Sequence, residues 1–377
     1  MSEYCSEILP EEEGIPICKS LCSSITEKPP CCLRIHPIDT SILILGTYKV
    51  NDNNSTDRKG SIDIMKYNNS FSSLALIKTQ ETSSAILDLK ISPFDYTLIA
   101  TVHSTGNITL WRLTIEDSLI DLSLIKNFQL FDETSLITSI NFSSVDDSLI
   151  LVTLTSGKIY TLKLQNSSLD ILNSFDENHS LEAWTGNFSS YDFLKNVIFT
   201  GGDDCKLLAH DIRSNQLIFK NDRIHNAGIV SILTPTPGDY NGNGSWNVNG
   251  NHYELMTGSY DDNVRSLDLR VLPPNDLIYS LPPKVNQSLN LGGGVWRLIP
   301  FGGKDDTDDR LLSCCMYNGA KILNKRENEN EIVVERVFKE NHNSMVYGAD
   351  WSTDGKFVAT CSFYDRLVQI WSPGYIY

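Results

Sequence analysis

Short apolar runs recur along the whole chain, and turns rich in Gly, Asn, Asp and Ser separate them. The runs are about four to eight residues long and contain mainly Ile, Leu, Val and Thr, a composition that predicts β-strands. No stretch sustains the apolar period of about 3.6 residues that marks an amphipathic helix. The pattern therefore predicts an all-β protein.

One strand–turn–strand motif is repeated. In Val197–Arg213 an apolar strand leads into the turn Gly201-Gly-Asp-Asp204, and a second strand ends in Asp-x-Arg. The motif recurs at Glu254–Arg270 and, with more changes, at Phe357–Ser372. A unit that recurs at a spacing of tens of residues indicates a repeat protein.

The repeats divide the chain into seven units. Six units hold four predicted strands and the seventh holds three, at 31–80, 85–130, 136–176, 181–222, 229–280, 294–339 and 346–372. A further strand at 15–24 can supply the missing outer strand, which would leave no sheet edge open. We therefore predict one seven-bladed β-propeller over 15–377, with N- and C-terminal strands sharing a blade, after a disordered acidic segment 1–14. In the first unit, the polar Asn/Asp stretch after Val50 is expected to be a loop.

The repeats resemble WD repeats, whose third strand ends in Trp-Asp. Trp111 and Trp371 keep the Trp, His210-Asp211 and Leu267-Asp268 keep the Asp, and His225 and His342 are the best matches to the opening His. In such repeats a turn Asp hydrogen-bonds the His and rigidifies the blade. This structural role is expected for three residues, Asp204, Asp261 and Asp365.

Charge and cysteine content limit the possible functions. The net charge of the 377 residues is −16, which argues against nucleic-acid binding, because that function needs a basic face. The acidity suits either a partner with a basic surface or solubility alone. No apolar run approaches the ~20 residues of a membrane-spanning helix, and the N-terminus lacks a signal-peptide pattern. Nine cysteines without paired CxxC clusters favour reduced thiols in the cytoplasm and no metal site.

Four stretches go beyond the general WD pattern. They are Leu181–Trp184, Gly201–Cys205, Gly292–Arg297, and Met345–Trp351 followed by Ala359–Asp365. Together they resemble the WD-repeat diphthine methylesterase family over about half of the chain. The resemblance implies a hydrolase that removes a methyl ester from methylated diphthine on a histidine of translation elongation factor 2, before a final amidation. It also implies a cytoplasmic protein, without a cofactor, that acts on a protein substrate, and we expect a monomer.

The chemistry of diphthine suggests a binding site. Its trimethylammonium group is a cation that donates no hydrogen bond, and aromatic faces with a carboxylate hold such a cation. The candidates are Trp184, Trp296, Tyr347 and Tyr364 with Glu182 or Asp203, and Arg297 could hold the ester carbonyl or the carboxylate product. The alternative is that these aromatic side chains simply pack between blades.

The hydrolytic residues are less well defined, because neither a Gly-x-Ser-x-Gly elbow nor an HExxH motif is present. Candidate bases are His225 and His342, oriented by a turn Asp, or the extra acid Asp203. Candidate nucleophiles are Cys205, Cys361 and Ser259, and direct attack by water is equally allowed. For each His a hydrogen bond within the blade, and for each Cys inert packing, is the structural alternative.

A second function of another class is a non-catalytic scaffold, for example in vesicle trafficking or ubiquitin-ligase recruitment. Most WD propellers bind partners and catalyse nothing, because fold alone does not determine function.

Overall fold

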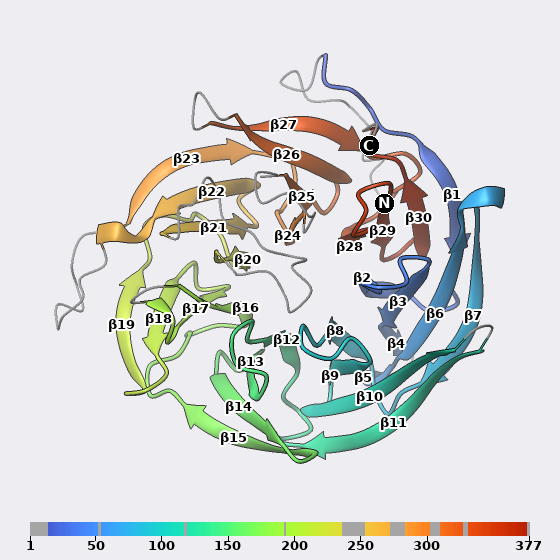
Figure 1. Ribbon diagram of the computed structural model, residues 1–377. Coiled ribbons are helices and arrows are strands. Elements are labelled where there is room, and N and C mark those ends of the chain that lie inside the picture. Colours follow the sequence, from blue (N-terminus) through green and yellow to red (C-terminus); the bar gives the residue numbers. More distant parts are fainter. Residues whose placement is uncertain are drawn as a thin grey trace.

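The computed structural model describes residues 14–51, 54–116, 119–191, 194–235, 253–271, 283–301, 310–326 and 331–374. Seven four-stranded antiparallel sheets are arranged around a central axis as the blades of a propeller (Figure 1). The predicted seven-bladed fold is confirmed. Apart from Gly14, the segment predicted to be disordered lies outside the described residues.

Each blade has its first strand next to the central axis and its fourth strand at the rim. Blades one and two contain β2 Pro30–Ile35, β3 Ile42–Thr47, β6 Ser61–Asn68 and β7 Ser73–Glu81, then β8 Ile86–Ile91, β9 Leu98–His103, β10 Asn107–Glu116 and β11 Leu119–Gln129. Blades three and four contain β12 Ile137–Phe142, β13 Leu149–Leu154, β14 Ile159–Gln165 and β15 Ser168–Ser174, then β16 Ala183–Phe188, β17 Val197–Gly202, β18 Leu207–Asp211 and β19 Gln216–Asn221. Blades five and six contain β20 Ile229–Leu233, β21 Glu254–Ser259, β22 Asn263–Asp268 and β23 Lys284–Asn290, then β24 Arg297–Pro300, β25 Leu311–Cys314, β26 Ala320–Arg326 and β27 Glu331–Phe338. Blade seven contains β28 Val346–Trp351, β29 Val358–Ser362 and β30 Leu367–Trp371, with β1 Ser20–Ile25 as its outer strand. Short 3₁₀ turns follow β6 and β22, at Asn69–Phe71 and Leu269–Val271.

The two ends of the chain close the ring, as predicted. Strand β1 pairs antiparallel with β30, from Ser20 opposite Trp371 to Ile25 opposite Leu367. The strand starts later than the expected residue 15, because residues 16–18 pair with the outer strand of blade six instead: the amide of Cys18 donates to the carbonyl of Val337 at 2.8 Å. The N-terminal segment thus joins the rims of blades six and seven (Figure 1).

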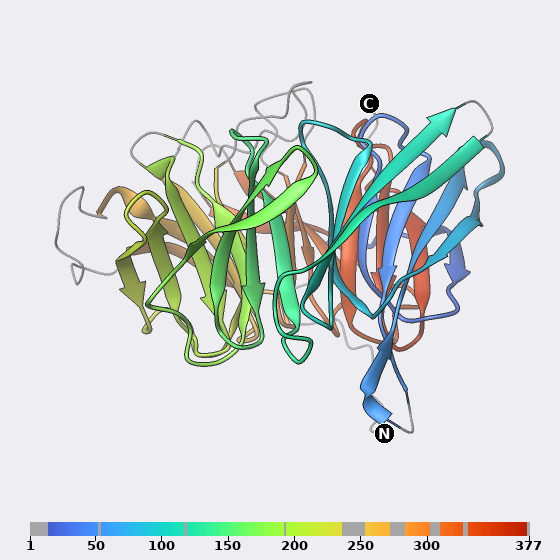
Figure 2. The same ribbon diagram turned by 90° about the horizontal axis from the view of Figure 1, so that it is seen from below.

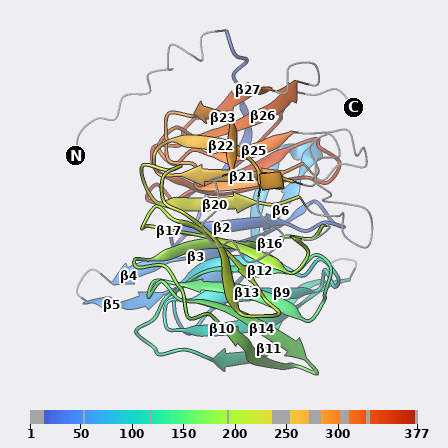
Figure 3. The ribbon, with the colours of Figure 1, turned by 90° about the vertical axis from the view of Figure 1, so that its left-hand side faces the viewer.

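The stretch after Val50 is not a loop, contrary to the prediction. Strands β4 Lys49–Asn51 and β5 Asn54–Lys59 pair as a hairpin between β3 and β6. Figures 2 and 3 show this hairpin projecting from one face of the disc. The hairpin packs on no core of its own, so its strands need no alternating apolar residues. Its polar sequence therefore did not predict strands.

The core lies between the faces of neighbouring blades. In the first interface, Ile42 and Ile44 of blade one pack with Ile86 and Ile99 of blade two, and all four are fully buried. Because each blade is covered on both faces, its middle strands are nearly continuous apolar runs instead of alternating ones. Strand β3, with the sequence ILILGT, is buried at every residue.

A bulge recurs at the start of the innermost strands. In six blades the ladder between the first and second strands skips one residue of the first strand, at Cys31, Leu87, Thr138, Trp184, Val230 and Tyr347. In blade six, Trp296 immediately precedes β24. A bulge re-aims the extra side chain out of the regular ladder. Five of the bulged residues and Trp296 line a single cavity at one end of the central channel.

Candidate functional site

The cavity has a volume of about 620 Å³ and is mostly apolar. Besides the bulged residues, it is lined by the base of the projecting hairpin at Lys49 and Val50. It therefore opens on the face of the disc that carries the hairpin. Its aromatic lining comes from blades one, four, five, six and seven and comprises Tyr48, Trp184, Tyr260, Trp296, Tyr347, Phe363 and Tyr364.

The aromatic side chains form a continuous arc. The centroid of the Trp296 ring lies 6.0 Å from that of Trp184, 6.0 Å from that of Tyr260 and 4.8 Å from that of Tyr347. The arc continues from Tyr347 to Phe363 at 5.5 Å. These separations are typical of offset and edge-to-face aromatic pairs, so the rings hold one another in place. All five rings of the arc line the same cavity.

Acidic groups lie at one end of this arc. The indole N–H of Trp184 donates to the Asp203 carboxylate at 3.2 Å. Asp203 is held in the turn after β17, where its amide donates to the carbonyl of Glu182 at 2.8 Å. Burial raises the pKa of Tyr260, and the negative charges of Asp203 and Glu182 raise it further. Asp203 thus places a carboxylate beside Trp184 at this end of the arc.

The cavity brings together four of the predicted binding residues: Trp184, Trp296, Tyr347 and Tyr364. Neither Glu182 nor Asp203 lines it, although Asp203 accepts a hydrogen bond from the indole N–H of Trp184. The assignment of these four aromatic residues to substrate binding remains a prediction, and the structure places all four at one cavity.

Three further aromatic residues were not assigned to the site from the sequence: Tyr48, Tyr260 and Phe363. A signal existed for Tyr260. It occupies in blade five the turn position that Asp203 occupies in blade four, since each amide donates to a carbonyl just before the innermost strand, at Gly228 and at Glu182.

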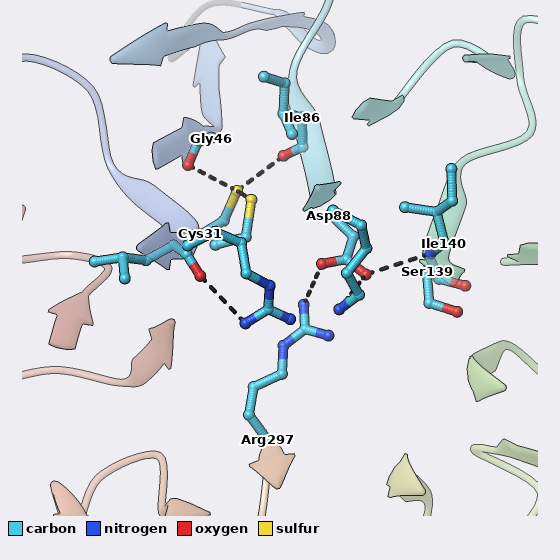
Figure 4. Close-up of polar contacts among 12 residues, drawn as sticks. Cys31, Gly46, Ile86, Asp88, Ser139, Ile140 and Arg297 are labelled. Atoms are coloured by element: carbon cyan, nitrogen blue, oxygen red, sulfur yellow. Dashed lines mark hydrogen bonds and ion pairs between the residues drawn. The ribbon is translucent and has the colours of Figure 1, made fainter. Parts of the chain in front are cut away.

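Arg297 does not line the cavity. Its Nη2 donates to Oδ1 of Asp88 on β8 at 3.0 Å, across the channel (Figure 4). The other oxygen of Asp88 lies 3.5 Å from Nζ of Lys90 and accepts from the amide of Ile140 at 3.3 Å. Burial alone would raise the pKa of Asp88, but Arg297, Lys90 and Arg34 hold it below its usual value. Burial lowers the pKa of Lys90 to about 7, helped by the positive charge of Arg34.

Both candidate histidine bases lie inside blades. The His342 ring nitrogens are hydrogen-bonded to Ser362 Oγ at 2.6 Å and to Thr360 Oγ1 at 2.8 Å. In blade five, His225 Nδ1 accepts from Arg265 at 3.0 Å. Burial lowers the pKa of both histidines to about 4. Neither lines the cavity, and their contacts are those of blade architecture.

The candidate nucleophiles also lie outside the cavity lining. Cys361 is fully buried, and burial raises the pKa of its thiol well above the usual value. Cys205 follows Asp204 in the turn with φ of 60°, and its pKa is raised by burial and by the neighbouring acids. Ser259 is buried and donates to the carbonyl of Ala227 at 3.1 Å. Because a thiol must ionise to attack, these environments disfavour both cysteines.

One cysteine that the sequence did not single out, Cys31, does line the cavity. Its Sγ donates to the carbonyls of Gly46 at 3.2 Å and Ile86 at 3.0 Å (Figure 4). Burial raises its pKa well above the usual value, so it remains a protonated thiol.

The three turn aspartates have different partners. Asp204 accepts from His179 at 2.8 Å, a histidine that was not selected from the sequence. Asp261 accepts from Arg265 at 2.9 Å, so Arg265 stands between it and His225. The expectation of direct His–Asp bonds is thus wrong for blades five and seven.

In blade seven, Asp365 accepts from the amide of Asn343 at 2.9 Å and from Ser344 Oγ at 2.8 Å, not from His342. The equivalent amide bonds recur at Ser180 in blade four and Asn226 in blade five. Fixing the start of the blade through this amide is the role that all three share.

Within the described part of the chain, no three His, Cys, Asp or Glu side chains gather as they would around a metal ion. No helix there is both long and apolar enough to cross a membrane.

Comparison with known proteins supports the fold from two directions. A family model described as "WD domain, G-beta repeat" matches residues 334–372. Sqt1 from Chaetomium thermophilum, solved bound to the N-terminus of ribosomal protein L10, superposes with a TM-score of 0.68 over 94% of this chain and 100% of that one, at 13% identity. A chain of the mitotic checkpoint complex gives 0.66 over 98% and 96%, at 12% identity. Such low identities show the propeller fold alone.

Curated relatives are much more similar in sequence. The protein named diphthine methyltransferase of Saccharomyces cerevisiae is 39% identical, over 92% of this chain and 96% of its own length. That of Schizosaccharomyces pombe is 31% identical over 92% and 95%, and that of Homo sapiens 28% over 78% and 62%. With two relatives above 30% identity over nine-tenths of its length, the chain belongs to the WD-repeat diphthine methyltransferase family, the one that its four sequence motifs resemble.

Proposed function

We propose that the protein is a methyl ester hydrolase of diphthamide biosynthesis, which acts in the cytoplasm on methylated diphthine of translation elongation factor 2. The relatives' names support an action on diphthine. The observation that carries the proposal is the aromatic arc around one cavity, with Asp203 at its end.

The arc has the chemistry that a trimethylammonium group requires. Such a group is a cation without N–H donors, so it gains nothing from hydrogen-bond acceptors but is attracted by the faces of aromatic rings. Each desolvated contact of this kind contributes about 1–2 kcal/mol. Trp184, Trp296 and Tyr347 bring adjacent aromatic rings to one cavity, and the Asp203 carboxylate adds a negative charge beside Trp184.

The position of the cavity suits a modified side chain on a protein. It lies at the mouth of a channel whose innermost strands contact their neighbours around the ring, so a folded protein cannot enter it. A long side chain that stands out from a protein surface can reach the arc from outside. The projecting β4–β5 hairpin flanks the opening and is available to contact the same protein.

The relatives' name denotes methyl transfer, whereas our proposal is the hydrolysis of a methyl ester. The two reactions change the substrate in opposite directions: transfer adds one methylene mass and needs a methyl donor, and hydrolysis removes one and needs only water. Since the predicted nucleophiles lie outside the cavity lining, water is the attacking group in this proposal. Asp203 also lies outside the lining, but it accepts a hydrogen bond from the cavity residue Trp184, so we assign it the role of base.

The test is to incubate the purified protein with methylated elongation factor 2 and to measure the modified peptide by mass spectrometry, with and without a methyl donor. We expect the loss of one methylene mass without a donor. Trp296→Ala should slow this loss at least tenfold, because it removes the ring at the centre of the arc. Phe71→Ala, which removes an exposed aromatic side chain at the rim, is the matched control and should be neutral.

A gain of mass that depends on the donor would replace hydrolysis by transfer. An unchanged mass under all conditions would favour the scaffold function.

A further inference from the structure

A charged layer lies directly below the aromatic arc. Leu87 and Trp296 line the cavity, and the next residues of the same segments are Asp88 and Arg297. An extended chain advances about 3.3 Å per residue, so the charged layer is one step deeper in the channel. The guanidinium carbon of Arg297 lies 5.9 Å from the centroid of the Trp296 ring, which places the two layers in contact.

Cations outnumber carboxylates in this layer. Arg34, Lys90 and Arg297 face Asp88, and the second carboxylate, Asp350, already accepts the amides of Ile35 at 2.9 Å and Trp351 at 3.0 Å. Because the protein as a whole carries a charge of −16, a positive excess inside its channel is a local feature and not a consequence of composition.

Arg297 and Lys90 do not line the cavity itself, but they keep hydrogen-bond donors in the layer beneath it. The Asp88 side chain is 1% exposed, whereas those of Arg297 and Lys90 are 16% and 15% exposed. Among the described residues, Arg297 uses one of its five N–H donors, toward Asp88, and Nζ of Lys90 is 3.5 Å from the same carboxylate. Asp88 therefore anchors both cations without saturating them (Figure 4). A bound anion would complete their pairing, which matters because unpaired buried charges are costly.

The aromatic arc and the charged layer together match a substrate that carries both a quaternary ammonium group and a carboxyl group. In a betaine, the quaternary nitrogen and the carboxyl group are attached to the same carbon, and diphthine has this arrangement. With the ammonium against Trp296, the carboxyl group reaches one step further along the channel, to Arg297.

We propose that the layer of Arg297 and Lys90, anchored by Asp88, is an anion site that binds the ester carbonyl of the substrate and the carboxylate of the product, so that the cavity recognises betaines. This inference rests on the proposed function. In hydrolysis the oxygen of water bonds to the carbonyl carbon and the bond to the methoxy oxygen breaks. One proton of the water leaves with methanol and the other goes to solvent. The negative charge that develops on the carbonyl oxygen faces Arg297, and such preorganised donors lower the barrier.

The test compares two small probes that share the ammonium group. Tetramethylammonium and glycine betaine are titrated into the protein, and binding is followed by the fluorescence of Trp184 and Trp296. We expect glycine betaine to bind about tenfold more tightly, because its carboxylate adds charge-assisted hydrogen bonds to Arg297 and Lys90. Lys90→Met should reduce this preference and leave tetramethylammonium binding unchanged. Lys356→Met removes the same charge from an exposed position and is the control.

The outcomes separate the two proposals. Equal affinities of the wild-type protein for both probes overturn the anion site and leave the aromatic cage intact, and this measurement requires no variant. A preference that survives in folded Lys90→Met overturns the role of Lys90. If neither probe binds, the cage and the anion site both fail, and the mass-spectrometric assay then decides the proposed function alone.

Discussion

At the scale of the residue, environment separates side chains of the same type into different roles. Trp111 lies inside blade two, where its indole N–H donates to Thr101 Oγ1 at 2.9 Å and Thr101 contacts His103 at 2.9 Å. This is the rigidifying network of a WD repeat. Trp184 and Trp296 belong to starts of innermost strands and face the cavity instead. Residue type alone does not distinguish these two groups, whereas position in the blade does.

His342 offers a direct test of structural against catalytic roles. His342→Ala removes two hydrogen bonds and leaves the buried hydroxyls of Thr360 and Ser362 without this partner. We expect the free energy of unfolding to fall by about 2–4 kcal/mol, measured by urea denaturation, while the turnover of folded protein changes less than threefold. A hundredfold loss of turnover at unchanged stability would restore His342 as a catalytic base.

Lys90 makes ligand binding depend on pH. It is buried with Arg34, Arg297, Asp88 and Cys32 around it, and its pKa is lowered to about 7. Lys90 is therefore charged below pH 7 and neutral above it. We expect the affinity for glycine betaine to fall several-fold as the pH rises from 6 to 8.5, with a midpoint above 7 because a bound carboxylate favours the charged amine. Tetramethylammonium binding in the same titration should stay constant.

The control for this titration is Lys90→Met, in which the affinity for glycine betaine should no longer change between pH 6 and 8.5. A pH-independent affinity of the wild-type protein would show that Lys90 does not contact the ligand.

At the scale of the element, the bulge in the innermost strands supplies part of the site. A regular strand alternates its side chains between the two faces of the sheet, which here pack against the two neighbouring blades. The extra residue breaks this alternation, and in blades four and seven the bulged residues Trp184 and Tyr347 line the cavity. The aromatic arc thus combines two bulged residues with Trp296, which precedes β24, and with turn residues such as Tyr260.

The sequence predicted the features that leave a local pattern and missed those that depend on contacts between distant residues. Strand runs and turns were sufficient for seven blades and for closure by the N-terminal strand, because both follow from local patterns. The motifs around Trp184, Trp296 and Tyr347 located part of the cavity. Asp88 was not predicted, since an isolated acid in the run ILDLKI looks like any exposed strand residue. Its partner Arg297 is about 200 residues away, and local patterns do not report such contacts.

Closure by β1 should be essential for stability. Deleting residues 1–26 exposes the edge of β30, which in the intact protein pairs with β1. Exposed edges pair with other chains, so we expect a lower melting temperature and aggregation, measured by scanning fluorimetry and size-exclusion chromatography. The control deletion of residues 1–13 keeps β1 and should behave like the full chain. A monomeric 1–26 deletion with an unchanged melting temperature would contradict this role of β1.

At the scale of the whole molecule, the ring distributes its stability over many similar blades. Each interface between blades repeats the same packing of aliphatic side chains, and the polar networks inside the blades rely on buried neutral histidines. These histidines lie in different blades, at His103, His210, His225 and His342. Their titration therefore acts on the entire propeller.

The four histidines should make the propeller sensitive to mild acid. Burial lowers the pKa of each to about 4, against about 6.5 in an unfolded chain. Between these values the unfolded state binds more protons, so the free energy of unfolding falls as the pH decreases from 6.5 to 4. The slope is at most about 1.4 kcal/mol per pH unit for each histidine. Urea denaturation between pH 7.5 and 5 should show this decline.

A variant separates the histidines from the carboxylates as the cause of this decline. His103→Gln removes one of the buried titrating groups, and its slope between pH 6.5 and 5 should be smaller than that of the wild-type protein. Because the pKa of Asp204 and that of Asp261 are both lowered, these carboxylates remain ionised in that range and cannot produce the difference. A free energy of unfolding that stays constant from pH 7 to 5.5 would mean that the histidines are protonated in the folded state. The neutral networks described for blades two and seven would then be wrong.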